Sequence, residues 1–404
     1  MRILQLTVKP PYPAVDGGCI AIKNFSDIIL EGGHELKILS LATHKHPFVP
    51  EEIPADFREK TDIEAVYVKT EINFIDAFSS FITMDSYNIS RFYSVDFDAL
   101  LEETLLGAEY DIVQLESLFM TPYISTIRRN SQAKVLLRSH NFEHSIWEQI
   151  AAREDVRFKR WYLKFLASRL KNYELEIMDS LDGVIAISTA DEKRYKNLKT
   201  KRPVSCIPFG IEIDDYPFDT EVNKIPKLFH LGAMDWQPNI DGIHWFLKQV
   251  WPDLSINQPQ AELHLGGRAM NIEEFKGYGS RVFLEGEVES ATDFMLSNDI
   301  MVVPLHTGGG IRIKILEGMA MGKTVVSTSI GAEGIHANDG EEIFIANSAN
   351  EFVDILNKLL TDREKVREVG INARSFVQRN FNKSVLRERY ESFCIDLTRK
   401  TTVS

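Results

Sequence analysis

Short apolar runs alternate along the chain with longer segments whose apolar residues recur every three or four positions. The run at 2–8 is followed by a loop rich in Pro and Gly, and then by helical spacing at 19–33 that ends at two glycines. Short apolar strands between helices are typical of a parallel sheet that is covered on both faces. The predicted strands lie at 2–8, 34–42, 111–116, 134–140, 184–188, 227–234, 261–267, 281–288, 299–305, 324–328 and 342–346.

The alternation is interrupted at 203–218, a stretch with three prolines, and it restarts afterwards. The pattern therefore predicts an α/β protein with two Rossmann-like, doubly wound domains that face each other across a cleft. The N-terminal domain is expected at 1–210, with a C-terminal helix at 384–404 packing back onto it, and the C-terminal domain at 211–383. Because ligands of such sheets bind at the carboxyl ends of the strands, the candidate side chains should directly follow strands.

The composition is that of an ordinary globular chain, with 44% apolar and 26% charged residues. The formal net charge of −13 disfavours a nucleic-acid partner, because an acidic chain repels phosphate backbones. The N-terminus lacks the apolar core and cleavage site of a signal peptide, and no apolar run reaches the length of a membrane-spanning helix. Since three scattered cysteines indicate reduced thiols, the sequence predicts a cytoplasmic protein, soluble or at most peripheral to the inner face of the membrane.

The segment 141–182 contains neither Gly nor Pro, and it predicts one long helix or two shorter ones. Within it, 153–171 combines basic and aromatic residues, which is unusual in an acidic chain. Such a face would suit contact with an anionic membrane surface. The competing interpretation, an ordinary amphipathic helix that covers the sheet, is the one that the sequence favours.

The strongest local signal is the stretch TGGGIRIKILEG at 307–318, directly after the strand at 299–305. Glycines let the main chain approach phosphate oxygens, and the stretch has three in a row, Gly308, Gly309 and Gly310. Arg312 can clamp a phosphate with two parallel hydrogen bonds, and Lys314 adds a point charge. Glu317 can accept hydrogen bonds from a ribose diol. The alternative is that Glu317 only interacts with the helix dipole while both cations are solvated, but the combination after one strand favours a binding site.

Two further signals also follow predicted strands. Gly17 and Gly18 open a helix whose N–H groups can approach an anion, although for the pair alone a turn that needs positive φ is the better interpretation. They form no Gly-x-Gly-x-x-Gly fingerprint, so no dinucleotide cofactor is expected. His140 ends a strand, where a cleft residue and a structural histidine are equally good interpretations. No metal site is predicted, because Glu143 stands at the wrong offset between His140 and His144 and no third ligand is evident.

The loop at 231–242 follows a strand as well and supplies Asp235, Asn239 and Asp241. Helix capping accounts for most of this pattern, so a direct ligand role is a secondary hypothesis. We therefore expect Asp235 or Asn239 to cap the helix that follows.

Several motifs recur together in one known family. They are the Gly17–Gly18 loop before a helix ending EGGHELKILSL, VIAIS near Ser188, IPFGIEIDDY, FHLGAMDWQPNIDGIHWF, VFLEGEVE and GGGIRIKILEGMAMGKTVVST. With these motifs the chain resembles, over nearly its whole length, the GT-B glycosyltransferases of family 4 (glycosyl transferases group 1), which are retaining and metal-independent. The resemblance implies transfer of a sugar from a nucleotide diphosphate sugar to a hydroxyl of a glycan or lipid-linked acceptor.

For the N-terminal domain, the resemblance implies that Gly17 and Gly18 bring main-chain amides to the donor diphosphate and the reacting centre. It also implies that His140 contacts the transferred sugar. Together with the two cations of the second domain, His140 forms the expected catalytic set.

For the C-terminal domain, the resemblance implies that Glu287 and Val288 lie near the nucleotide base. Gly309 and Gly310 would meet the sugar and the phosphate, and Glu317 would hold the ribose. The family usually has a Glu where this chain has Gly309, so the donor sugar is not inferred from typical members.

A second departure concerns the loop after the first strand of the C-terminal domain. The family tends to have an Arg and a Lys there, whereas GAMDWQPN has neither. Arg312 and Lys314 are predicted to replace those cations.

The leaving diphosphate gains negative charge as the glycosidic bond breaks, and the two cations and main-chain amides would stabilise it, so neither a metal ion nor a cofactor is expected. The expected setting is the synthesis of a surface polysaccharide or a lipid-linked glycan.

Two alternative functions stay open. One is a nucleotide-sugar epimerase or hydrolase of the same fold, which stays open because position 309 is a glycine and lacks the family's usual Glu. The other is a noncatalytic scaffold that binds a nucleotide sugar, against which His140 and the set of Arg312, Lys314 and Glu317 argue.

Overall fold

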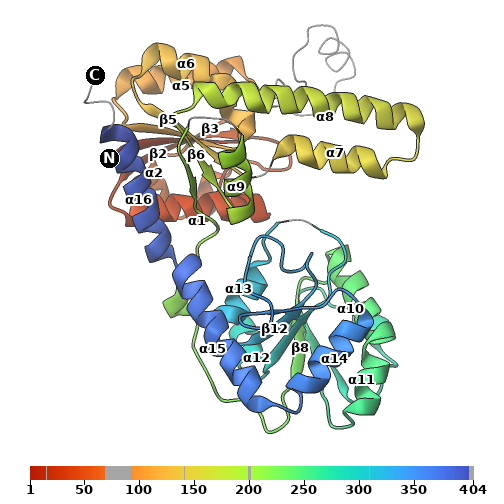
Figure 1. Cartoon of the computed structure of the whole chain (residues 1–404). Coiled ribbons are helices and arrows are strands. Elements are labelled where there is room, and N and C mark those ends of the chain that lie inside the picture. Colours follow the sequence, from red (N-terminus) through yellow and green to blue (C-terminus); the bar gives the residue numbers. More distant parts are fainter. Residues whose placement is uncertain (15, 69–91, 141, 199–201, 309, 400–404) are drawn as a thin grey trace. The chain divides into compact units, whose positions relative to one another are not determined.

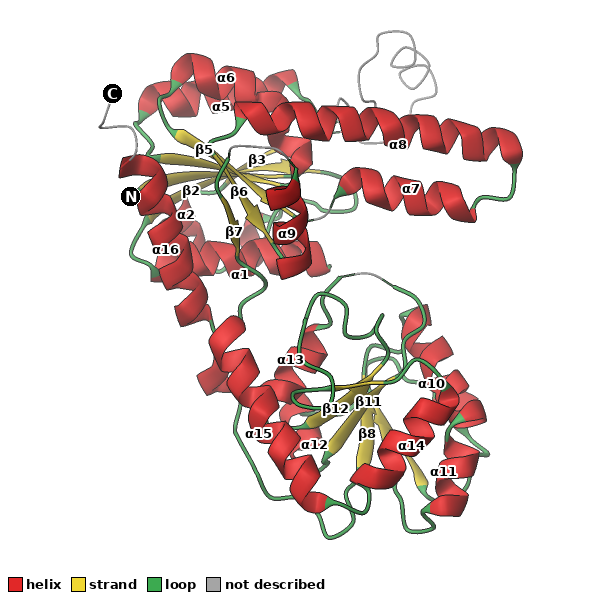
Figure 2. Cartoon of the chain, in the orientation of Figure 1, coloured by secondary structure: helices red, strands yellow, loops and turns green. Residues whose placement is uncertain are grey.

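The chain forms two compact units, shown in sequence colours in Figure 1 and by secondary structure in Figure 2. Unit 1 consists of Met1–Gly210 and Leu386–Ser404, and unit 2 of Ile211–Val385. None of the helices in the described ranges is long and apolar enough to cross a membrane. The structure, a computed structural model, describes residues 1–14, 16–68, 92–140, 142–198, 202–308 and 310–399.

The sheet of unit 1 has the strands β1 (Arg2–Thr7), β2 (Glu35–Ala42), β3 (Glu64–Tyr67), β4 (Ile112–Glu116), β5 (Lys134–Ser139), β6 (Gly183–Ala186) and β7 (Val204–Cys206). They run parallel in the order β3-β2-β1-β4-β5-β6-β7, which reverses between β1 and β4. Helices cover both faces (Figure 2). The helices of unit 1 are α1 (Gly17–Glu31), α2 (Ala55–Thr61), α5 (Val95–Gly107), α6 (Ile124–Asn130), α7 (Glu143–Arg153), α8 (Arg157–Ile177), α9 (Thr189–Asn197) and α16 (Lys383–Arg399).

The sheet of unit 2 has the strands β8 (Leu228–Leu231), β9 (Leu263–Gly266), β10 (Val282–Gly286), β11 (Ile300–Val303), β12 (Thr324–Ser327) and β13 (Phe344–Ile345). They are parallel in the order β10-β9-β8-β11-β12-β13, which reverses between β8 and β11. The helices are α10 (Gln237–Gln249), α11 (Trp251–Asn257), α12 (Ala291–Leu296), α13 (Ile313–Ala320), α14 (Ala349–Leu359) and α15 (Arg363–Asn380). The predicted α/β fold with two parallel, doubly wound sheets is confirmed.

Burial on both faces explains why the strands read as apolar runs. Successive residues of a strand point to opposite faces. Accordingly, Leu4 and Leu6 belong to one hydrophobic cluster, whereas Ile3 belongs to another that includes Phe25 of α1 and Tyr390 of α16. A strand with two covered faces has no position for alternating polar residues, so its sequence pattern is continuous rather than periodic.

The structure settles two questions about helices. The segment 141–182 forms two helices, α7 and α8, rather than one. The apolar spacing at 241–254, with Ile243, Phe246, Leu247 and Val250 on one face, predicts a single helix. This prediction is wrong, because α10 ends at Gln249 and α11 begins at Trp251. Pro252 has no N–H, and its ring would clash with the carbonyl four residues before it, so the helix cannot continue through this point.

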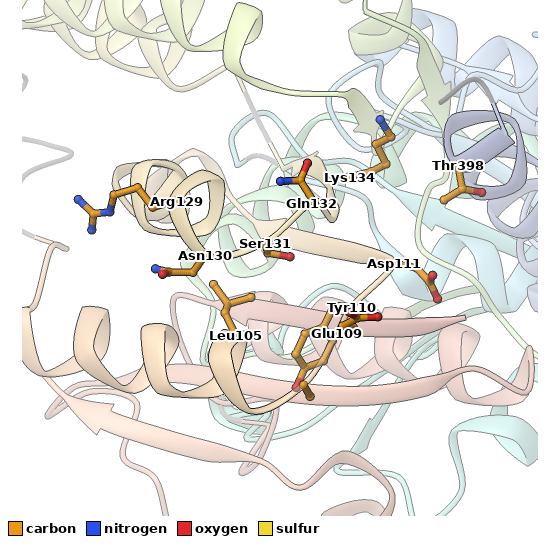
Figure 3. Close-up of a pocket in the computed structure, with 11 residues that line it drawn as sticks. Leu105, Glu109, Tyr110, Asp111, Arg129, Asn130, Ser131, Gln132, Lys134 and Thr398 are labelled. Carbon is orange, nitrogen blue, oxygen red and sulfur yellow. The ribbon is translucent and has the colours of Figure 1, made fainter. Parts of the chain in front are cut away.

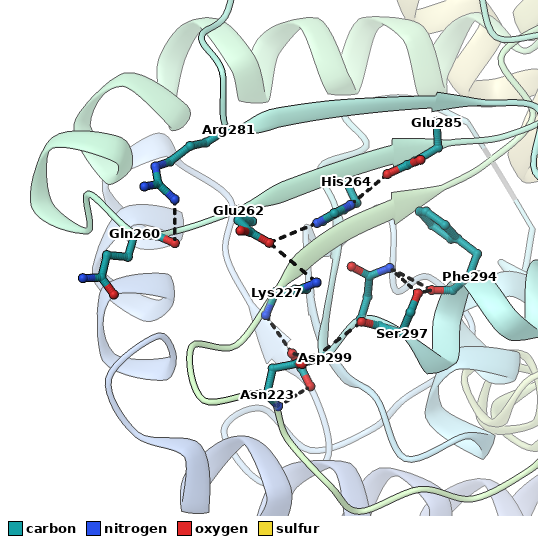
Figure 4. A network of polar contacts seen from close by, with 11 residues as sticks. Asn223, Lys227, Gln260, Glu262, His264, Arg281, Glu285, Phe294, Ser297 and Asp299 are labelled. Carbon is teal, nitrogen blue, oxygen red and sulfur yellow. Dashed lines mark hydrogen bonds and ion pairs between the residues drawn. The ribbon is translucent and has the colours of Figure 1, made fainter.

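The amino edge of the unit 2 sheet is held by Asp299, which lies just before β11 (Figure 4). Its buried carboxylate accepts hydrogen bonds from the backbone N–H groups of Asn223 (3.1 Å) and Lys227 (2.7 Å) and from the side-chain amide of Asn223 (2.8 Å). Lys227 directly precedes β8, so this carboxylate joins the starts of β8 and β11.

Replacing Asp299 with Ala is expected to lower the free energy of opening of unit 2 by about 3 kcal/mol, because two backbone N–H groups lose a buried acceptor. Native-state hydrogen exchange of the β8 and β11 amides measures this value. Glu262, a more exposed carboxylate of the same edge, pairs with Lys227 and is the control. Its replacement with Ala should cost less than about 1 kcal/mol. Equal losses for the two variants would contradict the assignment.

Candidate functional site

The loop between β1 and α1 places a cation at the start of α1. Asp16 caps this helix, accepting a hydrogen bond from the Cys19 N–H at 3.0 Å. Its carboxylate also accepts from the Lys9 ammonium at 2.9 Å and lies 2.8 Å from His46 Nε2. Burial opposes ionisation of Asp16, but these three bonds outweigh it and hold the pKa of Asp16 well below its ordinary value. Lys9 is thereby held at the carboxyl end of β1.

Gly17 and Gly18 are the first two residues of α1, and neither has positive φ. The interpretation as a turn that needs positive φ is therefore wrong. A Cβ on Gly18 would lie only 2.6 Å from Lys9 Nζ, so the missing side chain lets the ammonium lie against the first turn of the helix. The first turn of α1 and the Lys9 ammonium, two groups suited to an anion, thus lie together with the Asp16 carboxylate as their partner.

His140 follows β5 and contacts a buried ion pair. Glu116, the last residue of β4, is fully buried, and its Oε2 accepts a hydrogen bond from Arg138 Nη1 at 2.8 Å. His140 Nε2 lies 2.9 Å from the same oxygen. The Arg138 guanidinium is also buried, with its carbon 4.3 Å from the centroid of the Phe25 ring. Thus β4 and β5 bring a carboxylate, a guanidinium and an imidazole together at the carboxyl end of the sheet.

The second oxygen of Glu116 is satisfied by amides from neighbouring strands. Gln5 of β1 donates to Oε1 at 3.0 Å, and Gln114 of β4 donates at 2.6 Å. Gln5 in turn accepts from Ser26 of α1 at 2.7 Å, and Gln114 accepts from Tyr390 of α16 at 3.0 Å. These hydrogen bonds hold both oxygens of the buried Glu116 carboxylate, so they also fix the position of His140.

The ionisation of this group follows from its contacts. Burial would raise the pKa of Glu116, but Arg138 and His140 outweigh it and lower the pKa to about 2. Burial lowers the pKa of His140, an effect that Glu116 opposes and that the charges of Arg138 and Lys9 reinforce. His140 is therefore neutral at pH 7. Nε2 of His140 lies 2.9 Å from Glu116 Oε2 and 3.2 Å from Arg138 Nη1. The closer contact is to an ionised carboxylate, which can only accept, so Nε2 carries the proton and Nδ1 is left as a hydrogen-bond acceptor.

In unit 2, Arg312 turns back toward the loop after β8. Its guanidinium carbon lies 5.0 Å from the centroid of the Trp236 ring, and its Nη1 donates to the Gly310 carbonyl at 2.7 Å. Gly308 lies beside both side chains with a φ of 104°, and a Cβ there would be 2.8 Å from Arg312 Nη2 and from the indole. Burial lowers the pKa of Arg312, and the charge of Glu333 opposes this. The partly desolvated cation therefore lies between the loops after β8 and β11, where the strand order reverses.

Lys314 and Glu317, on the first turns of α13, form an ion pair. Lys314 Nζ lies 2.6 Å from Glu317 Oε2, while Glu317 Oε1 accepts a hydrogen bond from the Tyr216 hydroxyl at 3.1 Å. Burial and the neighbouring carboxylate raise the pKa of Tyr216, so it stays a donor. The side chain of Glu317 is therefore already oriented, and Tyr216 is a partner that the sequence analysis did not identify.

The remaining predicted residues of unit 2 lie in the loop after β10. Val288 packs over the end of β9, where a Cβ on Gly266 would be 2.9 Å from Val288 Cγ1. The Glu287 carboxylate accepts from the Ala269 N–H at 3.2 Å. Predicted residue Gly309 lies outside the described residues. The predicted site residues thus form two groups, one at the carboxyl end of each sheet.

The expected helix cap at 235–239 is wrong. The N-cap of α10 is Trp236, which makes no side-chain capping bond. Asp235 instead pairs with Arg268 at 2.9 Å, and Asn239 donates to the Ala233 carbonyl at 2.9 Å. These side chains shape the loop that presents Trp236 to Arg312.

A hollow of about 520 Å³ lies at the opposite edge of the unit 1 sheet (Figure 3). Asp111, which precedes β4, and Lys134, which begins β5, contribute to its wall, as do Arg129 and Thr398. In doubly wound sheets the ligand site lies at the carboxyl ends, so this hollow is on the wrong edge for catalysis.

Comparison with known proteins agrees with this architecture. The segment 225–362 matches the family described as Glycosyl transferases group 1. A 44.6 kDa protein in the cps region of Klebsiella pneumoniae, itself uncharacterized, is 26% identical over 94% of this chain and 96% of its own length. Sucrose-phosphate synthase of Thermosynechococcus elongatus has a TM-score of 0.66 at 16% identity, covering 99% of this chain and 100% of that one. HepE of Anabaena, solved with UDP, has a TM-score of 0.62 at 14% identity, covering 98% and 100%.

The two parallel sheets and these structural likenesses define the GT-B fold, as predicted. Unit 2 contains the segment that matches glycosyl transferases group 1, and this match identifies an enzyme of the glycosyltransferase class. The prediction of an enzyme of this class is confirmed. Assignment to family 4 in particular stays a prediction.

Proposed function

We propose that the protein is a retaining, metal-independent glycosyltransferase of family 4 that acts in the synthesis of a surface polysaccharide. It transfers a sugar from a nucleotide diphosphate sugar to a hydroxyl of a glycan or lipid-linked acceptor. A relative in a cps region supports the polysaccharide setting, and a structural neighbour solved with UDP supports a uridine nucleotide as the first donor to test.

The position of Arg312 carries the proposal. Its guanidinium lies against Trp236, in the loop where the family tends to have its own cations, and beside Gly308 and Gly310. A cation and main-chain amides at this point would stabilise the charge on a departing diphosphate more in the transition state than before it. Because Arg312 and the main-chain amides would stabilise this charge, no metal ion would be needed to bind the diphosphate.

Glu317 and His140 take separate roles in this reaction. The Glu317 carboxylate, held by Lys314 and Tyr216, would accept the hydrogen bonds of the ribose hydroxyls. His140, with Nε2–H directed to Glu116, would accept a hydrogen bond from a hydroxyl of the transferred sugar at Nδ1. Gly17 and Gly18 would bring the first turn of α1 to the same reacting centre.

The test is a thermal-shift screen of nucleotide sugars followed by turnover of the best donor in EDTA. Bound donor raises the apparent stability. We expect turnover to depend on an acceptor, to persist in EDTA and to give a product whose anomeric configuration, read by NMR, matches that of the donor. Loss of turnover in EDTA that is restored by Mg²⁺ or Mn²⁺ would refute metal independence, and an inverted anomer would refute retention. Equal donor consumption with and without acceptors would favour the hydrolase or epimerase alternative.

A further inference from the structure

The helices α7 and α8 form a hairpin that extends beyond the sheet of unit 1. Figure 1 shows them side by side, with the turn that joins them standing away from the strands. The base of the hairpin is fixed. Glu174 of α8 is buried, and its carboxylate lies 2.5 Å from His144 Nδ1 and accepts hydrogen bonds from the first N–H groups of α7, those of Glu143 and His144. The hairpin is therefore a rigid projection rather than a loose loop.

The two ends of α8 differ in their surroundings. Toward its C-terminal end, Ala167 and Leu170 are buried, as the interpretation of a helix covering the sheet requires. Its first two turns depart from that interpretation, since Phe158 is 76% exposed and Trp161 is 55% exposed. The chain between α7 and α8 adds Val156, which is 60% exposed. The hairpin tip, residues 154–165, thus presents large apolar side chains to the surroundings.

The exposed rings of Phe158 and Trp161 and the half-buried ring of Phe165 form an ordered row. The centroids of Phe158 and Trp161 are 6.0 Å apart, and those of Trp161 and Phe165 are 6.1 Å apart with the rings stacked. Arg169 continues the row, with its guanidinium 5.0 Å from the Phe165 centroid. Contiguous exposed apolar groups of this kind mark an interaction surface.

The charge around the row identifies the partner. From Arg157 to Lys171, α8 has six basic residues and no acidic one, in a chain with a net charge of −13. The hairpin tip itself has four basic residues and two acidic ones, Glu154 and Asp155, so it carries a net positive charge. Arg157, Lys159 and Lys164 are exposed at the hairpin tip, and Lys159 pairs with Glu154 at 2.5 Å. Aromatic rings that lie at headgroup depth, flanked by exposed cations, are suited to a surface of anionic lipids.

We propose that the hairpin tip docks on the surface of an anionic lipid bilayer. Phe158 and Trp161 enter the headgroup layer, and the basic residues of α8 contact the lipid phosphates. The docking needs neither donor nor acceptor, so its test is independent of the transferase proposal.

The experiment is flotation of the full chain with vesicles of phosphatidylcholine alone or mixed with phosphatidylglycerol, without substrates. The wild type is expected to float with the anionic vesicles only. The double variant Phe158→Ala with Trp161→Ala, and separately Arg157→Glu with Lys159→Glu, should each reduce the bound fraction at least about tenfold. Added salt should weaken binding of the wild type.

Two matched controls separate docking from general effects. Leu106→Ala with Ile256→Ala removes apolar groups that are 72% and 73% exposed elsewhere. Lys248→Glu with Lys276→Glu makes the same change in net charge as the basic-tip variant. Both controls should float like the wild type. Failure of the wild type to bind anionic vesicles, or unchanged binding of the aromatic variant, would overturn the proposal. So would sedimentation that shows a wild-type dimer lost in the aromatic variant, since the tip would then join two copies of the chain.

Discussion

Replacing Arg312 with Met is expected to lower kcat/KM for sugar transfer about a thousandfold, most of it in kcat. Met keeps much of the contact with Trp236 but removes the charge that we propose stabilises the departing diphosphate. Because this charge acts mainly on the transition state, the dissociation constant of the donor should change by less than about tenfold. Steady-state kinetics in EDTA and donor binding by calorimetry measure the two effects separately.

The matched control is Arg281→Met, the same substitution at the amino edge of the same sheet. Arg281 is exposed, directly precedes β10 and donates to the Gln260 carbonyl, so it lies at the end of the strand opposite to its carboxyl end (Figure 4). We expect its kinetics to stay within about twofold of the wild type. Near-normal turnover of the Arg312 variant would refute the role of this side chain in catalysis.

Replacing Glu116 with Gln is expected to lower the free energy of opening of unit 1 by about 3 kcal/mol at pH 7, because it leaves the Arg138 guanidinium buried without a counter-charge. Hydrogen exchange of the β4 and β5 amides reports this change. The double variant Glu116→Gln with Arg138→Met removes both charges while keeping contact with Phe25. It should recover most of the loss.

The pH dependence gives the same prediction a second readout. The ordinary pKa of Glu116 is 4.5, and in the folded chain it is lowered to about 2. The stabilisation by the ionised carboxylate is therefore fully present above pH 4.5 and is lost as the pH falls toward 2. The difference between the wild type and the single variant should shrink over this interval. A difference that stays constant from pH 7 to pH 3 would contradict the ion-pair explanation.

Most of the fold could be predicted because buried parallel strands have a strong local pattern. The strands β1, β4 and β11 stand out as apolar runs between helices, and their order along the chain implies parallel pairing. The break between α10 and α11 was missed because the apolar spacing continues through Pro252, although proline itself was a visible signal. Strand register and the reversal of strand order depend on contacts between distant segments.

The candidate site was predictable only in part. The glycines and charges at 308–317 form a local pattern, but the contact of Arg312 with Trp236 joins two loops about seventy residues apart. Glu116 was missed even though a signal was present, since Gln5, Gln114 and Arg138 are polar residues within strands predicted to be buried on both faces. Polar residues at such positions need partners, and Glu116 provides them.

The helix α7 begins three residues after His140, and its far end leads to the hairpin tip. With 11 residues, α7 spans about 16 Å. If the hairpin tip rests on a bilayer, the length of the hairpin would fix the distance between the His140 imidazole and the lipid phosphates. Acceptors tethered to lipid would react only when their sugar chain extends to that height, and lengthening or shortening α7 by whole turns would shift the accepted chain length.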